Sequence, residues 1–249
     1  MATTRLTGRR ALVTGASGGI GGAVAVGLAE AGADLVLTYE GHRADTEAVA
    51  DRVTGLGRTA EVVHADLGDT DAGRDLVARV TAATGPVDVL VANAGTGVQA
   101  SWDEVGDDLW ERTFAINVTA SWQLTRAVLP GMIERRFGRI LYVSSVAALN
   151  GGVIGPHYAA SKAALHGLMH HLAPRVAEHG VTVNTIAPAL IAGTRMLPTD
   201  PDHPDRLPMP IPVGHLGEPA DIATMALAML TNPYLTNKVI AVDGGLYPA

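Results

Sequence analysis

The stretch Thr14-Gly15-Ala16-Ser17-Gly18-Gly19-Ile20-Gly21-Gly22 decides how this chain folds. It follows an apolar run at residues 11–13 and opens a helix-compatible segment at residues 20–31. A glycine-rich turn between strand and helix lets the backbone approach a phosphate closely, and the helix supplies free N–H groups. Ordinary tight turns also contain glycine clusters, but the flanking strand and helix favour a dinucleotide-binding turn. We expect its contacts from Gly15, Ser17, Gly18, Gly19, Ile20 and Gly21.

The rest of the chain alternates between strand-like and helix-like segments. Apolar, β-branched runs predict further strands at residues 35–39, 61–64, 87–92, 140–143, 181–186 and 239–242. Helix-compatible segments lie at residues 46–56, 72–84, 108–135, 161–179 and 219–230. Because crossovers between parallel strands are right-handed, this alternation predicts a single α/β domain over residues 1–249. We expect a Rossmann fold, with a doubly wound parallel sheet of about seven strands and helices on both faces. The proline-rich segment at residues 192–219 is the candidate substrate lid.

Composition excludes several classes of protein. The 249 residues include no cysteine, which removes disulfides, thiolate nucleophiles and cysteine-based metal sites. The net charge of −7 argues against a nucleic-acid partner, because phosphate backbones bind basic surfaces. No stretch reaches the roughly 18 uninterrupted apolar residues of a membrane span, and residues 1–10 carry no signal-peptide pattern. We therefore expect a cytoplasmic protein without a membrane partner.

Tyr158 and Lys162 occur in the sequence Tyr158-Ala-Ala-Ser-Lys162. On a helix this spacing places the phenol and the ammonium on one face, one turn apart. A free phenol has a pKa of about 10, and a nearby positive charge lowers it toward neutrality. Ser145 follows one predicted strand, and Asn93-Ala94-Gly95 closes another. Because ligand crevices form at the carboxyl ends of parallel strands, these residues predict a proton-transfer site at one sheet edge.

Together these residues resemble the short-chain dehydrogenase/reductase family along essentially the whole chain. The match comprises the turn at residues 14–21, Asp66 and Leu67 as the adenine-contacting pair, Asn93 to Gly95, Asn117 in the active-site helix, the catalytic set Ser145, Tyr158 and Lys162, Pro188 after the sixth strand, and Asp243-Gly244-Gly245. The segment Gly217-Glu218-Pro219 and the overall length are most similar to the 3-oxoacyl-[acyl-carrier-protein] reductase branch.

The resemblance implies hydride transfer between a nicotinamide and a carbonyl or carbinol carbon. Tyr158 would give or take the proton on the oxygen, and Ser145 would hydrogen-bond that oxygen. Lys162 would lower the pKa of Tyr158 and hold the nicotinamide ribose, while Asn117 would hold a water that connects Lys162 to solvent. Pro188 and Thr194 would border the nicotinamide, although Thr194 stands six residues after Pro188 where the family places a threonine five residues after it.

The end of the second predicted strand bears on cofactor choice. Tyr39 stands where an NAD-selective site carries an acid, and Arg43 just beyond it suits a 2′-phosphate. The alternative is that Arg43 is a solvated loop charge, with Glu40 repelling a phosphate. We expect NADP(H) to be the preferred cofactor, with NAD(H) as the other choice.

Our first hypothesis for the reaction is NADPH-dependent reduction of a ketone, of the 3-oxoacyl or a similar apolar type, to a secondary alcohol. Residues 147–154 would form one wall of the substrate site, and the lid would supply Leu190, Ile191, Met196, Leu197, Met209 and Ile211. One alternative is an NAD-dependent secondary-alcohol or polyol dehydrogenase acting on a small-molecule alcohol. Another, from a different class, is a catalytically idle scaffold that senses nucleotides.

The remaining expectations concern partners and metals. Arg136 matches a position at which carrier-protein reductases recruit an acyl carrier, whereas His179 replaces the second arginine. His166 and His170 share a helix face without a third ligand, so we expect packing roles and no metal site. The helices predicted at residues 108–135 and 161–179 correspond to those through which the family forms tetramers, which predicts a homotetramer.

Overall fold

The computed structural model describes residues 6–197 and 209–248. Its seven strands form one parallel sheet in the order β3-β2-β1-β4-β5-β6-β7. The strands are β1 (Arg10–Val13), β2 (Asp34–Tyr39), β3 (Ala60–His64), β4 (Val89–Ala92), β5 (Gly138–Val143), β6 (Val181–Pro188) and β7 (Val239–Val242). This confirms the predicted parallel α/β sheet with helices on both faces. The strand order reverses between β1 and β4, where doubly wound sheets form their ligand crevice.

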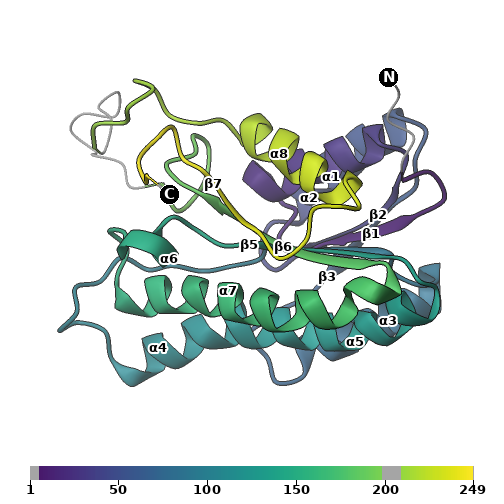
Figure 1. Cartoon of the computed structure of the whole chain (residues 1–249), viewed down its shortest axis with the longest axis horizontal. Helices are drawn as coiled ribbons and strands as arrows, with labels where there is room; N and C mark the ends of the chain where they lie inside the picture. Colours follow the sequence, from purple (N-terminus) through teal and green to yellow (C-terminus); the bar gives the residue numbers. More distant parts are fainter. Residues whose placement is uncertain (1–5, 198–208, 249) are drawn as a thin grey trace.

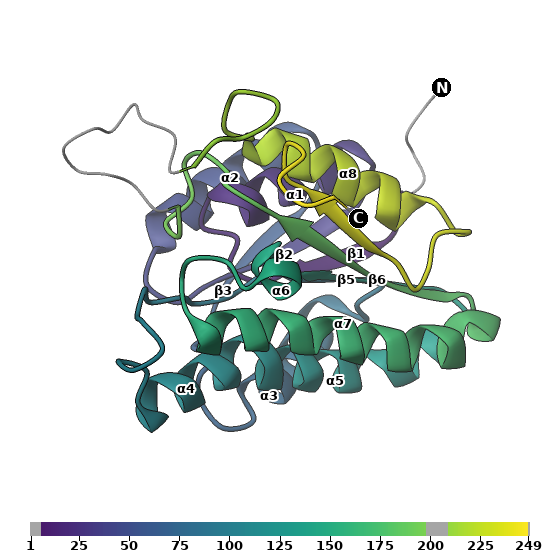
Figure 2. The same cartoon turned by 60° about the vertical axis from the view of Figure 1, so that its left-hand side comes forward.

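Helices cover both faces of the sheet (Figure 1). One layer contains α1 (Gly19–Glu30), α2 (Arg43–Gly55) and α8 (Pro219–Thr231), and the other contains α3 (Ala72–Thr84), α4 (Asp107–Phe114), α5 (Ala120–Glu134) and α7 (Pro156–Val176). The short helix α6 (Ala147–Asn150) lies beside the amino end of α7 in both views (Figure 2). Two buried apolar clusters, one on each side of the sheet, hold these layers together.

The long helix expected at residues 108–135 is interrupted. A π-helical turn, η1 (Ala115–Thr119), separates α4 from α5 and contains the buried Asn117. Such turns insert one extra residue per turn and are frequent at functional sites. The helix expected at residues 161–179 begins earlier, at Pro156, and a 3₁₀ turn, η2 (Ala177–His179), follows it. Tyr158 therefore lies in the first turn of α7.

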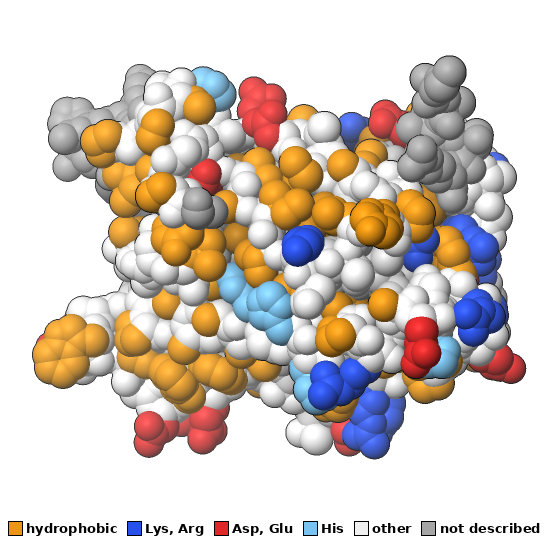
Figure 3. All heavy atoms as spheres, in the orientation of Figure 1, with side chains coloured by type: hydrophobic (Ala, Val, Ile, Leu, Met, Phe, Trp, Pro, Cys, Tyr) orange, Lys and Arg blue, Asp and Glu red, His pale blue; other side chains and the backbone are white. Residues whose placement is uncertain are grey.

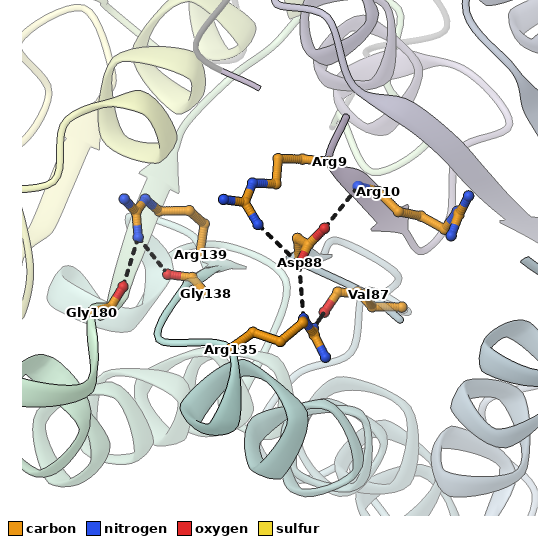
Figure 4. A network of polar contacts seen from close by, with 8 residues as sticks. All are labelled: Arg9, Arg10, Val87, Asp88, Arg135, Gly138, Arg139 and Gly180. Atoms are coloured by element: carbon orange, nitrogen blue, oxygen red, sulfur yellow. Dashed lines mark hydrogen bonds and ion pairs between the residues drawn. The ribbon is translucent and has the colours of Figure 1, made fainter. Parts of the chain in front are cut away.

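A network of arginines around Asp88 ties together the amino ends of β1, β4 and β5 (Figure 4). One Asp88 carboxylate oxygen accepts a hydrogen bond from the backbone N–H of Arg10 at 3.2 Å. The other lies 3.3 Å from Arg135 Nε and 3.7 Å from Arg9 Nη1. Arg139 donates to the carbonyls of Gly138 at 2.7 Å and Gly180 at 3.0 Å. The edge opposite the predicted ligand crevice is thus held by charge-assisted hydrogen bonds.

No helix in the described ranges, 6–197 and 209–248, has both the length and the apolar character needed to cross a bilayer.

Replacing Asp88 with alanine should lower the free energy of unfolding by about 2–3 kcal/mol, because two arginines and a backbone N–H lose their common acceptor. Urea denaturation followed by circular dichroism measures this loss. Asp75→Ala is the control, because the Asp75 side chain is 70% exposed and its ion pair with Arg74 spans 3.9 Å. A loss for Asp88→Ala no larger than that of the control would contradict the structural role of the network.

Candidate active site

The glycine turn after β1 is packed tightly against the end of β4. The Asn93 side-chain amide donates to the carbonyls of Thr14 and Gly15, each at 2.9 Å. A Cβ atom at Gly21 would collide with the Gly15 carbonyl and the Asn93 amide, and one at Gly15 would lie 3.0 Å from Ala94 Cα. Asn93 therefore shapes the turn, and glycine at these two positions is what permits the close approach.

Two adjacent cavities open along the carboxyl edge of the sheet. The first, of about 350 Å³, lies over the turn, Ser145, Tyr158 and Lys162, and we call it the reactive cavity. The second, of about 330 Å³, lies beyond the end of β2, and we call it the β2 cavity. Both are lined by Gly15, Ser17, Ala94, Gly95 and Arg195. One elongated ligand could therefore occupy both.

The shape and donors of these cavities fit a dinucleotide. No side chain caps the amino end of α1, and its first turn carries no acid, so its N–H groups are free for an anion. A Cβ atom at Gly18 would meet nothing within 4 Å. The reactive cavity is lined by the expected cofactor residues Gly15, Ser17, Gly18, Gly19, Ile20, Gly21, Asn93, Ala94, Gly95, Pro188 and Thr194. The β2 cavity is lined by Tyr39, Asp66 and Leu67.

Tyr158 and Lys162 meet in the reactive cavity, as the spacing predicts. The Lys162 ammonium lies 5.7 Å from the centre of the Tyr158 ring. It donates to the Val143 carbonyl at 2.9 Å. A Cβ atom at Gly95 would lie 3.0 Å from Lys162 Nζ, and one at Gly97 would lie 2.8 Å from the Tyr158 ring. The two glycines after β4 therefore leave the space that both side chains occupy.

The pKa of Tyr158 differs from the expectation based on Lys162. Burial raises the pKa of Tyr158, and a hydrogen bond with the Ser145 hydroxyl lowers it in part. Burial also lowers the pKa of Lys162 to about 8. Because the Lys162 ammonium is directed at the Val143 carbonyl, desolvation of the phenol outweighs its attraction to that charge. In this arrangement Tyr158 is a protonated phenol, which suits a proton donor.

Asn117 connects the β4 loop to α7 through its side chain. Its Oδ1 accepts the N–H of Thr96 at 2.8 Å, and its Nδ2 donates to the Thr96 carbonyl at 3.0 Å and to Ser161 Oγ at 2.9 Å. Ser161 in turn donates to the Tyr158 carbonyl at 2.8 Å. With three amide contacts made, the Asn117 side chain joins the β4 loop to the start of α7.

The two serines after β5 have different partners. The Ser144 hydroxyl donates to the Lys162 carbonyl at 2.9 Å and shares a 2.9 Å hydrogen bond with His166 Nε2. Ser145 instead lines the reactive cavity and accepts the N–H of Ala147 at 3.1 Å. Ser145 is therefore the hydroxyl available to a substrate. His170 pairs with Asn237 at 2.8 Å, so the two helix histidines contact different side chains.

Of the residues predicted from the sequence, Arg43, Thr194 and Asp66 differ in how they lie relative to the two cavities. Arg43 lines neither cavity: its Nε donates to Glu47 at 2.8 Å, and its side chain is 70% exposed. Thr194 lies beside the glycine turn: a Cβ atom at Gly19 would be 3.5 Å from Thr194 Cγ2. Asp66 accepts the Gly68 N–H at 2.8 Å and pairs with Arg112, and these contacts lower the pKa of Asp66.

The candidate lid is described only in part, since its residues 198–208 lie outside the described residues. Three of its predicted apolar residues line the reactive cavity, namely Met196, Leu197 and Met209, and so do Leu190 and Ile191 just before it. Ile211 is buried but does not line that cavity. On the facing wall, the lining residues include Ala147, Val153 and Ile154. The space around Tyr158 therefore has mostly apolar walls.

Sequence reasoning did not single out Ser161, Gly97, Arg112 or Arg195. Ser161 stands inside the Tyr158 to Lys162 motif, so its place beside the reacting pair was readable from the spacing. No local sequence pattern indicates Arg195, because its contact with Ser17 joins residues that are 178 positions apart. Within the described ranges, no group of three or more His, Cys, Asp or Glu side chains is placed to hold a metal ion.

Comparison with known proteins is consistent with this geometry. The sequence pattern of the short chain dehydrogenase family matches residues 9–204. The chain is 36% identical over 244 residues to a 2-dehydro-3-deoxy-D-gluconate 5-dehydrogenase from Pseudoalteromonas atlantica, covering 96% of each. It is 35% identical over 246 residues to the 3-oxoacyl-[acyl-carrier-protein] reductase FabG of Vibrio harveyi, covering 97% of this chain and 98% of the relative.

A solved structure gives the same result in three dimensions. The blue fluorescent protein from a metagenomic library, in complex with NADPH, matches with a TM-score of 0.90 and 36% identity. The match covers 98% of this chain and 100% of that one. The chain therefore belongs to the short-chain dehydrogenase/reductase family, whose members are oxidoreductases that interconvert alcohols and carbonyls with NAD(P).

Proposed function

We propose that this protein is an NADPH-preferring reductase that converts an apolar ketone, of the 3-oxoacyl or a similar type, to a secondary alcohol. The observation that carries the proposal is the meeting of Ser145, Tyr158 and Lys162 in one cavity with mostly apolar walls. A bound nicotinamide supplies the hydride that reduces the carbonyl carbon. The chain itself supplies the proton and holds the oxygen.

Tyr158 is the proton donor in this proposal. Tyr158 is 5% exposed, and burial raises the pKa of its phenol, so the phenol carries a proton at neutral pH. As the carbonyl carbon accepts hydride, the C=O π bond breaks and the Tyr158 proton passes to the oxygen. Ser145 donates a hydrogen bond to that oxygen, and the Lys162 ammonium stabilises the phenolate that remains. Asn117 and Ser161 hold the start of α7, and with it Tyr158, in position.

The apolar walls favour a ketone with hydrocarbon on one side. The side chains of Val153, Ile154, Leu190 and Met196 line the reactive cavity, and such walls do not satisfy the hydroxyls of a sugar. The reductase relative from Vibrio harveyi supports this choice. The sugar-acid dehydrogenase relative from Pseudoalteromonas atlantica supports the second candidate, oxidation of a polyol. Asn150 is a polar side chain in the same cavity that could contact a hydroxyl.

The surface around Arg136 does not favour recognition of an acidic acyl carrier. Arg136 donates to the Glu178 carbonyl at 2.8 Å, and His179 lies 3.7 Å from the Glu178 carboxylate. An acidic carrier approaching Arg136 would therefore meet Glu178 as well, and like charges at an interface oppose binding. We propose that the substrate is a free ketone or a 3-oxoacyl thioester rather than one presented by the carrier.

The preference for NADPH is also part of the proposal. Tyr39 ends β2 without the acid that would bind a ribose 2′-hydroxyl. The structural relative crystallised with NADPH supports the same preference.

We further propose that the chain forms a homotetramer. Trp110 on α4 and Trp122 on α5 are 40% and 41% exposed, and Trp110 stacks on Phe114 with ring centres 4.9 Å apart. Figure 3 shows many hydrophobic side chains on the face that includes α7, α8 and β7, with charged side chains mostly toward its edges. Light scattering is expected to give four chain masses, and a monomer mass would contradict this proposal.

Replacing Tyr158 with phenylalanine should reduce ketone turnover by at least about 1,000-fold, because the proton donor is lost while the ring is kept. Binding of NADPH, measured by fluorescence titration, should change by less than about threefold. Tyr247→Phe is the control, because Tyr247 lies outside both cavities, and this variant should retain turnover. Unchanged turnover in Tyr158→Phe would refute the mechanism. NADPH binding without any turnover in the unmodified chain would instead favour the nucleotide-sensing scaffold.

A substrate panel tests the reaction itself. We expect kcat/KM for small apolar ketones and 3-oxoacyl thioesters with NADPH to exceed, by about tenfold or more, the values for sugars and polyols with either oxidised cofactor. Steady-state assays of both directions at one pH provide the comparison. A higher kcat/KM for polyol oxidation with NAD would instead establish the second candidate.

A further inference from the structure

Arg195 occupies the junction of the two cavities. It belongs to the segment that follows β6, and it lines both the reactive cavity and the β2 cavity. Its Nη1 lies 3.4 Å from Ser17 Oγ in the glycine turn, and its Nη2 lies 3.3 Å from Asp45 Oδ2 in the first turn of α2. One guanidinium thus connects three segments that are far apart in the sequence.

The charges around the β2 cavity single out this guanidinium. The basic side chains that line the cavity are Arg112, Arg195 and His42, and the acidic ones are Glu40 and Asp66. Arg112 donates to both carboxylate oxygens of Asp66, at 3.1 and 3.2 Å, so its charge is already matched. Arg195 is paired only through Asp45 among the ion pairs of the described residues, with the two side chains 60% and 58% exposed. Exposed ion pairs of this kind contribute little stability and exchange readily.

The Asp45 carboxylate marks where an anion is attracted. Its Oδ2 lies 3.3 Å from Arg195 Nη2 and 4.0 Å from His42 Nδ1. A phosphate monoester carries about −1.5 to −2 charges at neutral pH and offers three acceptor oxygens. It would therefore compete well for a guanidinium that a single carboxylate holds at the surface.

We propose that Arg195 is the residue that recognises the 2′-phosphate of NADPH, and that it exchanges Asp45 for that phosphate when the cofactor binds. This inference rests on the proposed function and adds the residue that determines its cofactor preference. Arg43, the residue that the sequence indicates, is the rival: it is hydrogen-bonded to Glu47 and also interacts with Tyr39, which lines the β2 cavity. Thr194 and Met196 adjoin Arg195 and line the reactive cavity. The contact between Arg195 and the phosphate would therefore also hold this part of the cavity wall in place.

Direct binding measurements separate this role from catalysis. NADPH, NADH, 2′,5′-ADP and 5′-AMP are titrated by calorimetry against the full chain and four variants. Arg195→Met should weaken the binding of NADPH and 2′,5′-ADP by about 10- to 100-fold and change the affinities for NADH and 5′-AMP by less than about twofold. Asp45→Asn should increase the affinity for both 2′-phosphorylated ligands, because it removes the competing carboxylate.

Two further arginine variants serve as comparisons. Arg74→Met is the matched control. Arg74 also pairs with an aspartate, Asp71, at 2.8 Å, and its side chain is 62% exposed. It lines neither cavity. This variant should leave all four affinities unchanged. Arg43→Met tests the rival assignment. The inference is overturned if Arg43→Met is the variant that selectively loses affinity for NADPH and 2′,5′-ADP. It is also overturned if Arg195→Met weakens the binding of all four ligands equally, or of none of them.

Binding to the unmodified chain distinguishes a failure of the proposed function from a failure of the assignment of Arg195. If it binds neither NADPH nor NADH, the proposed function fails. If it binds NADPH tightly and Arg195→Met binds it equally well, only the assignment of Arg195 fails. If it binds NADH but not 2′,5′-ADP, both the NADPH preference and the role of Arg195 are overturned, whereas the reductase chemistry stands.

Discussion

The buried ammonium of Lys162 is the constraint on which the rest of this site depends. Lys162 is 2% exposed, and its Nζ donates to the Val143 carbonyl at the end of β5. Burying a charge is costly unless fixed dipoles replace water, and this cost appears as a pKa lowered to about 8. The ammonium therefore keeps its proton near neutrality by a small margin, one helical turn from the phenol of Tyr158.

The neighbouring residues make sense as supports for that charge. Gly95 leaves the space above β4 that Lys162 Nζ and Asn117 Oδ1 approach. The π-helical turn η1 contains Asn117, whose amide reaches both Thr96 and Ser161. On the other side of α7, Ser144 bonds the Lys162 carbonyl and leaves Ser145 to face the cavity. Strand ends, loop and helix are thus joined around one side chain.

The sequence predicts local periodicity and motif spacing well, and contacts between distant segments poorly. The central strands were readable because runs such as Val181–Pro188 are buried on both faces. The edge strands β3 and β7 are less buried and were indicated by their β-branched residues. The turn from Gly15 to Gly21 and the pair Tyr158 and Lys162 were readable because their geometry is set within a few residues. The π-helical turn and the position of Arg195 were not, because tertiary packing sets them. Arg43 was close in sequence to the predicted ribose site, yet its Nε pairs with Glu47 at i,i+4 and its side chain is 70% exposed.

The sequence contains only two lysines, Lys162 and the exposed Lys238, which allows the central charge to be observed directly. The protein labelled with ¹³Cε-lysine would give two signals, whose chemical shifts are followed by NMR from pH 6 to pH 11. The account predicts that the Lys162 signal titrates with a midpoint near pH 8, charged below it and neutral above it. A midpoint at the ordinary lysine value of about 10.4 would show that the ammonium is not desolvated and would contradict the account.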